Sequence, residues 1–79
     1  MSDATELHNK LAGQIVRSIV TPILESGGSR AAILVLTESV VAGVVEFCAL
    51  KDDVAREEVL EALIEGARQR VEQLKRSAR

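Results

Sequence analysis

Apolar residues recur every four positions along the first third of the chain. They form two rows, Leu7, Leu11, Ile15, Ile19 and Ile23, and Ala12, Val16, Val20 and Leu24. This period predicts an α-helix over about residues 3–26. Because four residues turn a helix by about 400°, each row shifts around the axis, and we expect the helix to touch more than one neighbour.

The end of this first helix carries turn signals. Pro22 lacks a backbone donor and crowds the carbonyl four residues earlier, so we expect the helix either to kink there or to restart with Thr21 as its cap. The pair Gly27-Gly28 predicts a stop in the left-handed conformation. Ser29 then stands where the next helix needs an N-cap.

Residues 30–50 are apolar around most of a helix circumference, interrupted mainly by Glu38 and Glu46. We predict a helix surrounded by others. The length also suits a membrane span, but an acidic residue near mid-span costs about 2.5 to 3.5 kcal/mol, so we expect no transmembrane segment. The remaining alternative is a β-hairpin turning at Glu38-Ser39, since many of these residues favour strands, although that pair lacks the Gly or Asn of tight hairpin turns.

Residues 53–78 show the clearest periodicity in the chain. The spacing 4, 3, 4, 3, 4 of an a/d seam joins Leu60, Ile64, Ala67, Val71, Leu74 and Ala78. Residues 52–65 include six acidic and one basic residue, whereas residues 68–79 include five basic and one acidic. The helix dipole favours this asymmetry, and antiparallel pairing of two such helices would bring opposite charges together.

These segments predict an all-α fold in one domain over residues 1–79, with helices at about 3–26, 30–50 and 53–78, the first of them kinked at Pro22. Only two helices are available to cover the apolar middle one. We therefore expect a symmetric helical-bundle homodimer. The alternative fold is α-β-β-α with a central hairpin.

Candidate chemistry is sparse. The single cysteine, Cys48, excludes an internal disulfide and favours a reducing, cytoplasmic location, and its apolar neighbours predict a buried structural role. Apart from Glu6 nearby, His8 has no second metal ligand at helical spacing, and Glu38 and Glu46 lack the Glu-x-x-His pairs of carboxylate-bridged metal sites. We predict no catalytic, cofactor-binding or metal-binding residue, no cofactor, and no enzymatic activity.

The chain has a net charge of −2 and one aromatic residue, Phe47, so it lacks both a basic character and stacking platforms for bases. We expect a small non-enzymatic helical protein that acts through self-association as a homodimer or by binding another protein. The alternatives are an accessory factor that binds DNA or RNA through its basic tail, and an interfacial membrane protein. The residues expected at the dimer interface are Val41, Val45, Leu60, Ile64, Ala67, Val71 and Leu74.

Overall fold

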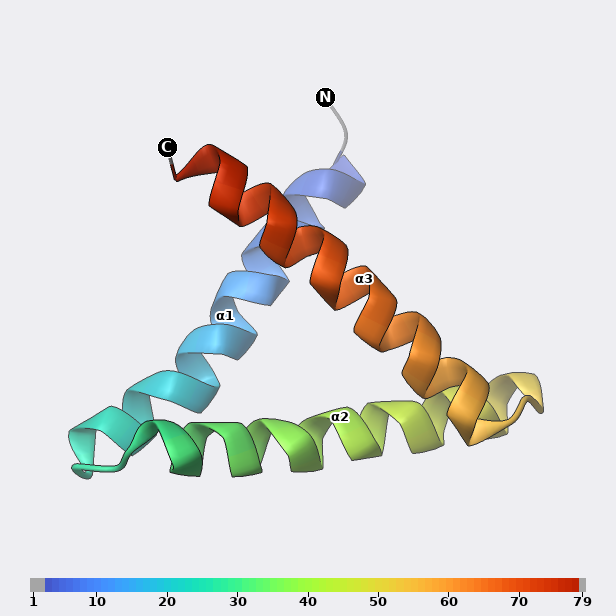
Figure 1. Cartoon of the computed structure of the whole chain (residues 1–79), viewed down its shortest axis with the longest axis horizontal. Helices are drawn as coiled ribbons and strands as arrows, with labels where there is room; N and C mark the ends of the chain where they lie inside the picture. Colours follow the sequence, from blue (N-terminus) through green and yellow to red (C-terminus); the bar gives the residue numbers. More distant parts are fainter. Residues whose placement is uncertain (1–2, 79) are drawn as a thin grey trace. The chain divides into compact units, whose positions relative to one another are not determined.

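The computed structural model describes residues 3–78, which form three α-helices joined by short turns (Figure 1). The helices are α1 (Asp3–Glu25), α2 (Arg30–Asp52) and α3 (Arg56–Ser77). No strand occurs in residues 3–78, so the predicted all-α, three-helix chain is confirmed and the alternative with a central hairpin is not supported.

The chain divides into two compact units, Met1–Val40 and Val41–Arg79. We call them the amino-terminal unit and the carboxy-terminal unit. The first contains α1 and the beginning of α2, and the second contains the rest of α2 and all of α3. Helix α2 is therefore common to both.

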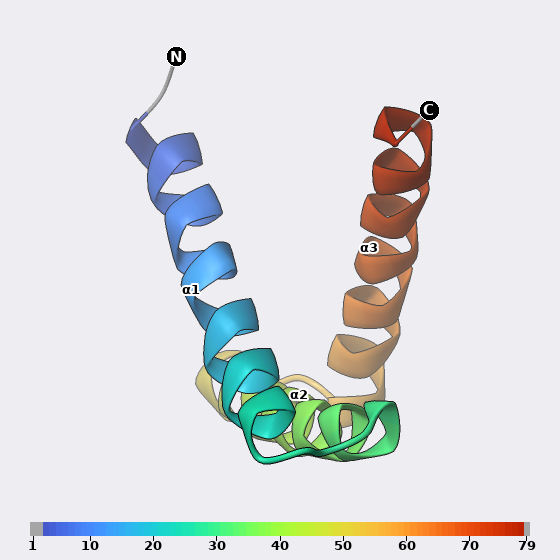
Figure 2. The same cartoon turned by 90° about the vertical axis from the view of Figure 1, so that its left-hand side faces the viewer.

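The turn between α1 and α2 (Figure 2) closes through Gly27 and Gly28. The Gly28 N–H donates to the Ile23 carbonyl at 2.8 Å, and the Gly27 N–H donates to the Leu24 carbonyl at 3.0 Å. This is the Schellman pattern, and Gly27 takes the left-handed φ of 79° that it requires. A Cβ on Gly28 would lie 2.5 Å from Cγ2 of Ile23, so this position also needs glycine.

Pro22 lies inside α1, which runs to Glu25 as one helix. The predicted restart with Thr21 as cap is therefore not formed. The Pro22 carbonyl still accepts the Ser26 N–H at 3.1 Å, so the helical hydrogen bonding continues past the proline. The predicted cap of the next helix is confirmed, because the Ala32 N–H donates to Oγ of Ser29 at 3.4 Å.

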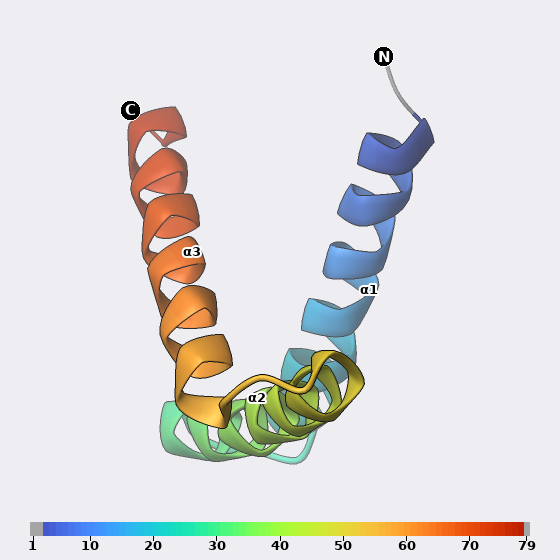
Figure 3. The ribbon, with the colours of Figure 1, turned by 90° about the vertical axis from the view of Figure 1, so that its right-hand side faces the viewer.

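The turn between α2 and α3 (Figure 3) lies later in the sequence than predicted. Asp53 adopts a positive φ of 55°, and the Val54 N–H donates to the Ala49 carbonyl at 3.1 Å. This closure extends α2 to Asp52 and delays the start of α3 to Arg56, two and three residues beyond the expected boundaries at about 50 and 53. Ala55 is the N-cap of α3 and supplies no side-chain hydrogen bond.

Only two of the described residues are buried, Val45 and Ala49, both on one face of α2 in the carboxy-terminal unit. On α3, Val59, Leu60 and Leu63 are half-buried and share one face. The two helices of this unit pack through these faces. In the amino-terminal unit the half-buried apolar residues are Ile19, Val20, Ile23 and Ile33.

Many large apolar side chains remain exposed on all three helices. They include Leu7, Leu11, Ile15, Val16 and Leu24 on α1, Leu34, Val35, Leu36, Val40, Val44, Phe47 and Leu50 on α2, and Ile64, Val71 and Leu74 on α3. The expectation that the middle helix is surrounded is therefore met on one face of α2 only.

Candidate association surface

The residues predicted to form a dimer interface fall into two groups. Val45 is buried, and Val41 and Leu60 are half-buried, so the chain's own helices cover much of all three. The other four are exposed on α3. They are Ile64, Ala67, Val71 and Leu74, which we call the exposed α3 seam.

The exposed α3 seam is a narrow strip on one helix. At about 100° per residue its four side chains lie within a sector of about 80°, and at 1.5 Å per residue they span about 15 Å along the axis. Exposure rises along the strip, from 42% at Ile64 through 53% at Val71 to 68% at Leu74. The apolar pattern of α3 thus continues past the part that packs on α2.

Charged side chains flank this seam unequally. Glu61, Arg68 and Lys75 are seven residues apart and lie together on one side of it, whereas Arg70 lies on the other side. Glu58 and Glu65 project from the outer face of the helix. Lys75 Nζ is 3.3 Å from Oε2 of Glu72, an exposed pair within one turn.

Glu46 forms an ion pair with Arg56. Its carboxylate accepts two hydrogen bonds from the Arg56 guanidinium, one from Nε to Oε1 and one from Nη2 to Oε2 at 2.8 Å. The hydrogen bond from Arg56 lowers the pKa of Glu46, and the same bond raises the pKa of Arg56. This pair joins α2 to the start of α3.

Sequence reasoning missed the Glu46–Arg56 pair. The two residues are ten positions apart and belong to different helices, so no helical periodicity connects them. Their opposite charges on either side of a predicted turn were the available signal. To predict the pair from these charges, the turn would have had to be placed at residues 53–55.

Helix α2 has the length and apolar composition of a candidate membrane span. Leu36, Val40, Phe47 and Leu50 are all exposed on the side of α2 away from its buried face. Glu38 lies between them in sequence and is also exposed.

The other two candidate residues, His8 and Cys48, belong to different helices. His8 is exposed on α1, and Cys48 is half-buried where the sequence predicted full burial. Within residues 3–78, no three His, Cys, Asp or Glu side chains cluster as a metal site would require.

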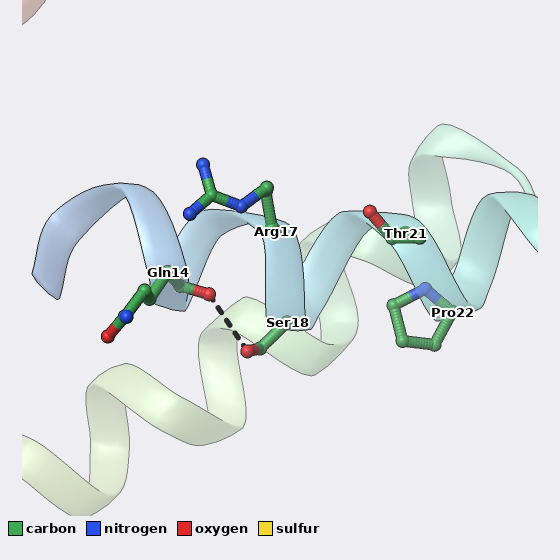
Figure 4. A pocket seen from close by; sticks show the side chains of 5 residues that line it. All are labelled: Gln14, Arg17, Ser18, Thr21 and Pro22. Atoms are coloured by element: carbon green, nitrogen blue, oxygen red, sulfur yellow. Dashed lines mark hydrogen bonds between the residues drawn. The ribbon is translucent and has the colours of Figure 1, made fainter. Parts of the chain in front are cut away.

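A hollow on α1 is lined by Gln14, Arg17, Ser18, Thr21 and Pro22 (Figure 4). Ser18 Oγ donates a hydrogen bond to the Gln14 carbonyl at 2.8 Å, so its hydroxyl proton is already used within the helix. All five lining residues come from one helix. A surface lined by a single helix cannot enclose a small molecule, which normally needs a concave site.

Comparison of the chain with protein-family models, with curated proteins and with solved structures finds no match to any of them.

Proposed function

We propose that this chain is a small non-enzymatic helical protein that acts by self-association, as a homodimer built on the carboxy-terminal unit. The observation that carries the proposal is the exposed α3 seam. Its residues continue the heptad spacing that packs α3 on α2, yet they lie in solvent. Apolar residues at that spacing are typical of a helix that pairs with another helix.

The seam alone supports a weak contact. A fully buried aliphatic side chain contributes about 1.5 to 3 kcal/mol, so Ile64, Val71 and Leu74, each roughly half exposed, would contribute about 2 to 5 kcal/mol per copy. Association itself costs about 4 to 15 kcal/mol. The homodimer therefore needs either high concentration or further apolar surface, which the exposed side chains of α2 can supply.

Sedimentation equilibrium from micromolar to several hundred micromolar protein tests the proposal. We expect a mass that rises from 8.5 kDa toward twice that value. The double variant Val71→Asp, Leu74→Asp should stay monomeric, because a charge at each position opposes burial. The matched control, Ala62→Asp, places the same charge on the opposite side of α3 and should still dimerise. A helical monomer at the highest wild-type concentration would contradict the proposal.

Binding experiments on the same purified protein test the two alternative functions, nucleic-acid binding and membrane association. The basic residues Arg68, Arg70, Lys75 and Arg76 are spread around α3 and form no single basic stripe, which favours dimerisation over nucleic-acid binding. Salt-dependent binding to duplex DNA would reverse that preference. Co-sedimentation with anionic vesicles, lost on Phe47→Asp, would assign the exposed side of α2 to a lipid surface.

A further inference from the structure

We propose that α2 opens locally over residues 39–44, and that this opening acts as a hinge between the two units. We call these six residues the α2 centre. The proposal goes beyond the homodimer and does not depend on it, because it concerns a single chain. It rests on the residue types of the α2 centre, on its packing and on the place where the two units divide.

The residue types of the α2 centre disfavour a helix. Its sequence is Ser-Val-Val-Ala-Gly-Val, and the three valines are β-branched, so their side chains lose rotamer freedom in a helix. Ser39 competes for backbone hydrogen bonds, and Gly43 disfavours a helix interior more than any residue except proline. By contrast, residues 61–65 in the middle of α3 are strong helix formers apart from Ile64.

Packing compensates little for this low helix preference. Val40 and Val44 are 39% and 46% exposed, and only Val41 of the valines in the α2 centre is half-buried. A Cβ on Gly43 would meet no atom within 4 Å. Both buried residues of α2 lie beyond the α2 centre, toward the turn to α3. Most helical stability in proteins comes from the packing of one face, and the α2 centre has little of that support.

The division between the two units falls inside the α2 centre, between Val40 and Val41. The two halves of α2 therefore belong to different units. In the turn before, Thr37 Oγ1 donates a hydrogen bond to the Ile33 carbonyl at 2.8 Å. A hydroxyl that bonds back to the preceding turn slightly destabilises a helix and often bends it. Few apolar contacts and exposed backbone hydrogen bonds are the conditions under which a segment opens locally.

Native-state amide hydrogen exchange, measured by mass spectrometry at low micromolar protein, tests the hinge. Protection factors at residues 41–44 should be at least about tenfold lower than at residues 61–65. A local opening exposes little surface, so exchange at residues 41–44 should change little in dilute urea. Exchange at residues 61–65 requires a larger opening and should accelerate with urea.

Two substitutions in the α2 centre should move its protection in opposite directions. Gly43→Ala should raise the protection factors at residues 41–44 about fivefold, because alanine is the better helix former and its Cβ has open space. Ala42→Gly should lower them by about the same factor. Gly66→Ala is the matched control, since Gly66 also lies within a helix and its Cβ would also meet no atom within 4 Å.

The control should raise protection in α3 and leave residues 41–44 within about twofold of wild type. Equal protection or an equal urea dependence at residues 41–44 and 61–65 would overturn the hinge, because both segments would then open together. A rise at residues 41–44 as large with Gly66→Ala as with Gly43→Ala would also overturn it. A chain that never dimerises would contradict the proposed homodimer and leave these expectations unchanged.

Discussion

The two units use similar turns but reach different degrees of burial. Each joins its helices through a residue of positive φ, Gly27 in one and Asp53 in the other, followed by a hydrogen bond that spans five residues. Yet the buried residues that the structure describes, Val45 and Ala49, both lie in the carboxy-terminal unit. A closed turn therefore does not by itself produce a core.

The difference follows from the apolar spacing of the helices. On α1 the apolar residues recur only at intervals of four, so the apolar face shifts around the helix axis along its length. The half-buried side chains of α1 are therefore confined to Ile19, Val20 and Ile23, near the turn. On α3, residues 59, 60 and 63 share one face and meet a face of α2 on which Ala49 is small enough for close approach. Most of the packing stability should therefore reside in the carboxy-terminal unit.

The largest effect should come from charging that packed face. Val45→Asp buries a carboxylate with no described partner nearby and should lower the free energy of unfolding by about 3 kcal/mol or more. Val35→Asp, at a position 60% exposed on the same helix, is the control and should cost under about 1 kcal/mol. Urea denaturation followed by circular dichroism measures both. Equal losses would mean that α2 is not asymmetrically buried.

The glycine turn of the amino-terminal unit provides the next test. Gly28→Ala should destabilise by about 1 to 3 kcal/mol, because its Cβ would meet Cγ2 of Ile23 at 2.5 Å. Gly27→Ala should cost about 1 kcal/mol, since the left-handed φ disfavours any Cβ although the space around it is open. Thermal denaturation gives the order. A milder effect at Gly28 than at Gly27 would contradict the close contact with Ile23.

Two changes should stabilise the other turn. Asp53→Gly removes the strain of a positive φ, and Ala55→Ser adds a side-chain acceptor at the uncapped start of α3. Each should raise the free energy of unfolding by about 0.5 to 1 kcal/mol. Because they act on separate backbone groups, the effects should add in the double variant. A destabilising Asp53→Gly would show that the aspartate has a contact beyond its backbone conformation.

The smallest effect concerns the ion pair between α2 and α3. Arg56 lowers the pKa of Glu46 from its ordinary value of 4.5, so the pair stabilises the fold above that pH and loses its effect as pH falls through the lowered pKa. The stability difference between wild type and Glu46→Gln should be small and constant near neutral pH and should vanish in acid. Adding Arg56→Gln to Glu46→Gln should cost little more. A difference that persists at pH 2 would assign the loss to packing.

Local signals in the sequence predicted the helices well. The glycine stop at residues 27–28, the cap by Ser29 and the four-residue rows of α1 each depend on a few neighbouring residues, and each appears in the structure. The second turn lies slightly later than predicted because Asp53 occupies a conformation usually left to glycine. An aspartate followed by no glycine gives little indication of a helix end.

The candidate surface was predictable only in part. The seam spacing identified Ile64, Ala67, Val71 and Leu74 together with Val41, Val45 and Leu60, but periodicity does not show where a helix leaves its intramolecular neighbour. That point depends on how far α3 packs along α2, which is a property of three-dimensional packing. The exposure values divide the predicted set into residues covered by the chain and residues open to a partner.

Helix α2 is continuous across the two units, so the chain cannot be truncated cleanly between them. The division between the units falls at Val40 and Val41, in the middle of a 23-residue helix, so a truncation there would cut through a hydrogen-bonded ladder and leave two frayed ends. A substitution that stabilises or destabilises the centre of α2 should therefore change the stability of both units. Gly43 lies two residues beyond that division, and a Cβ there would meet open space. The substitution Gly43→Ala should therefore make the two units unfold more nearly in a single thermal transition.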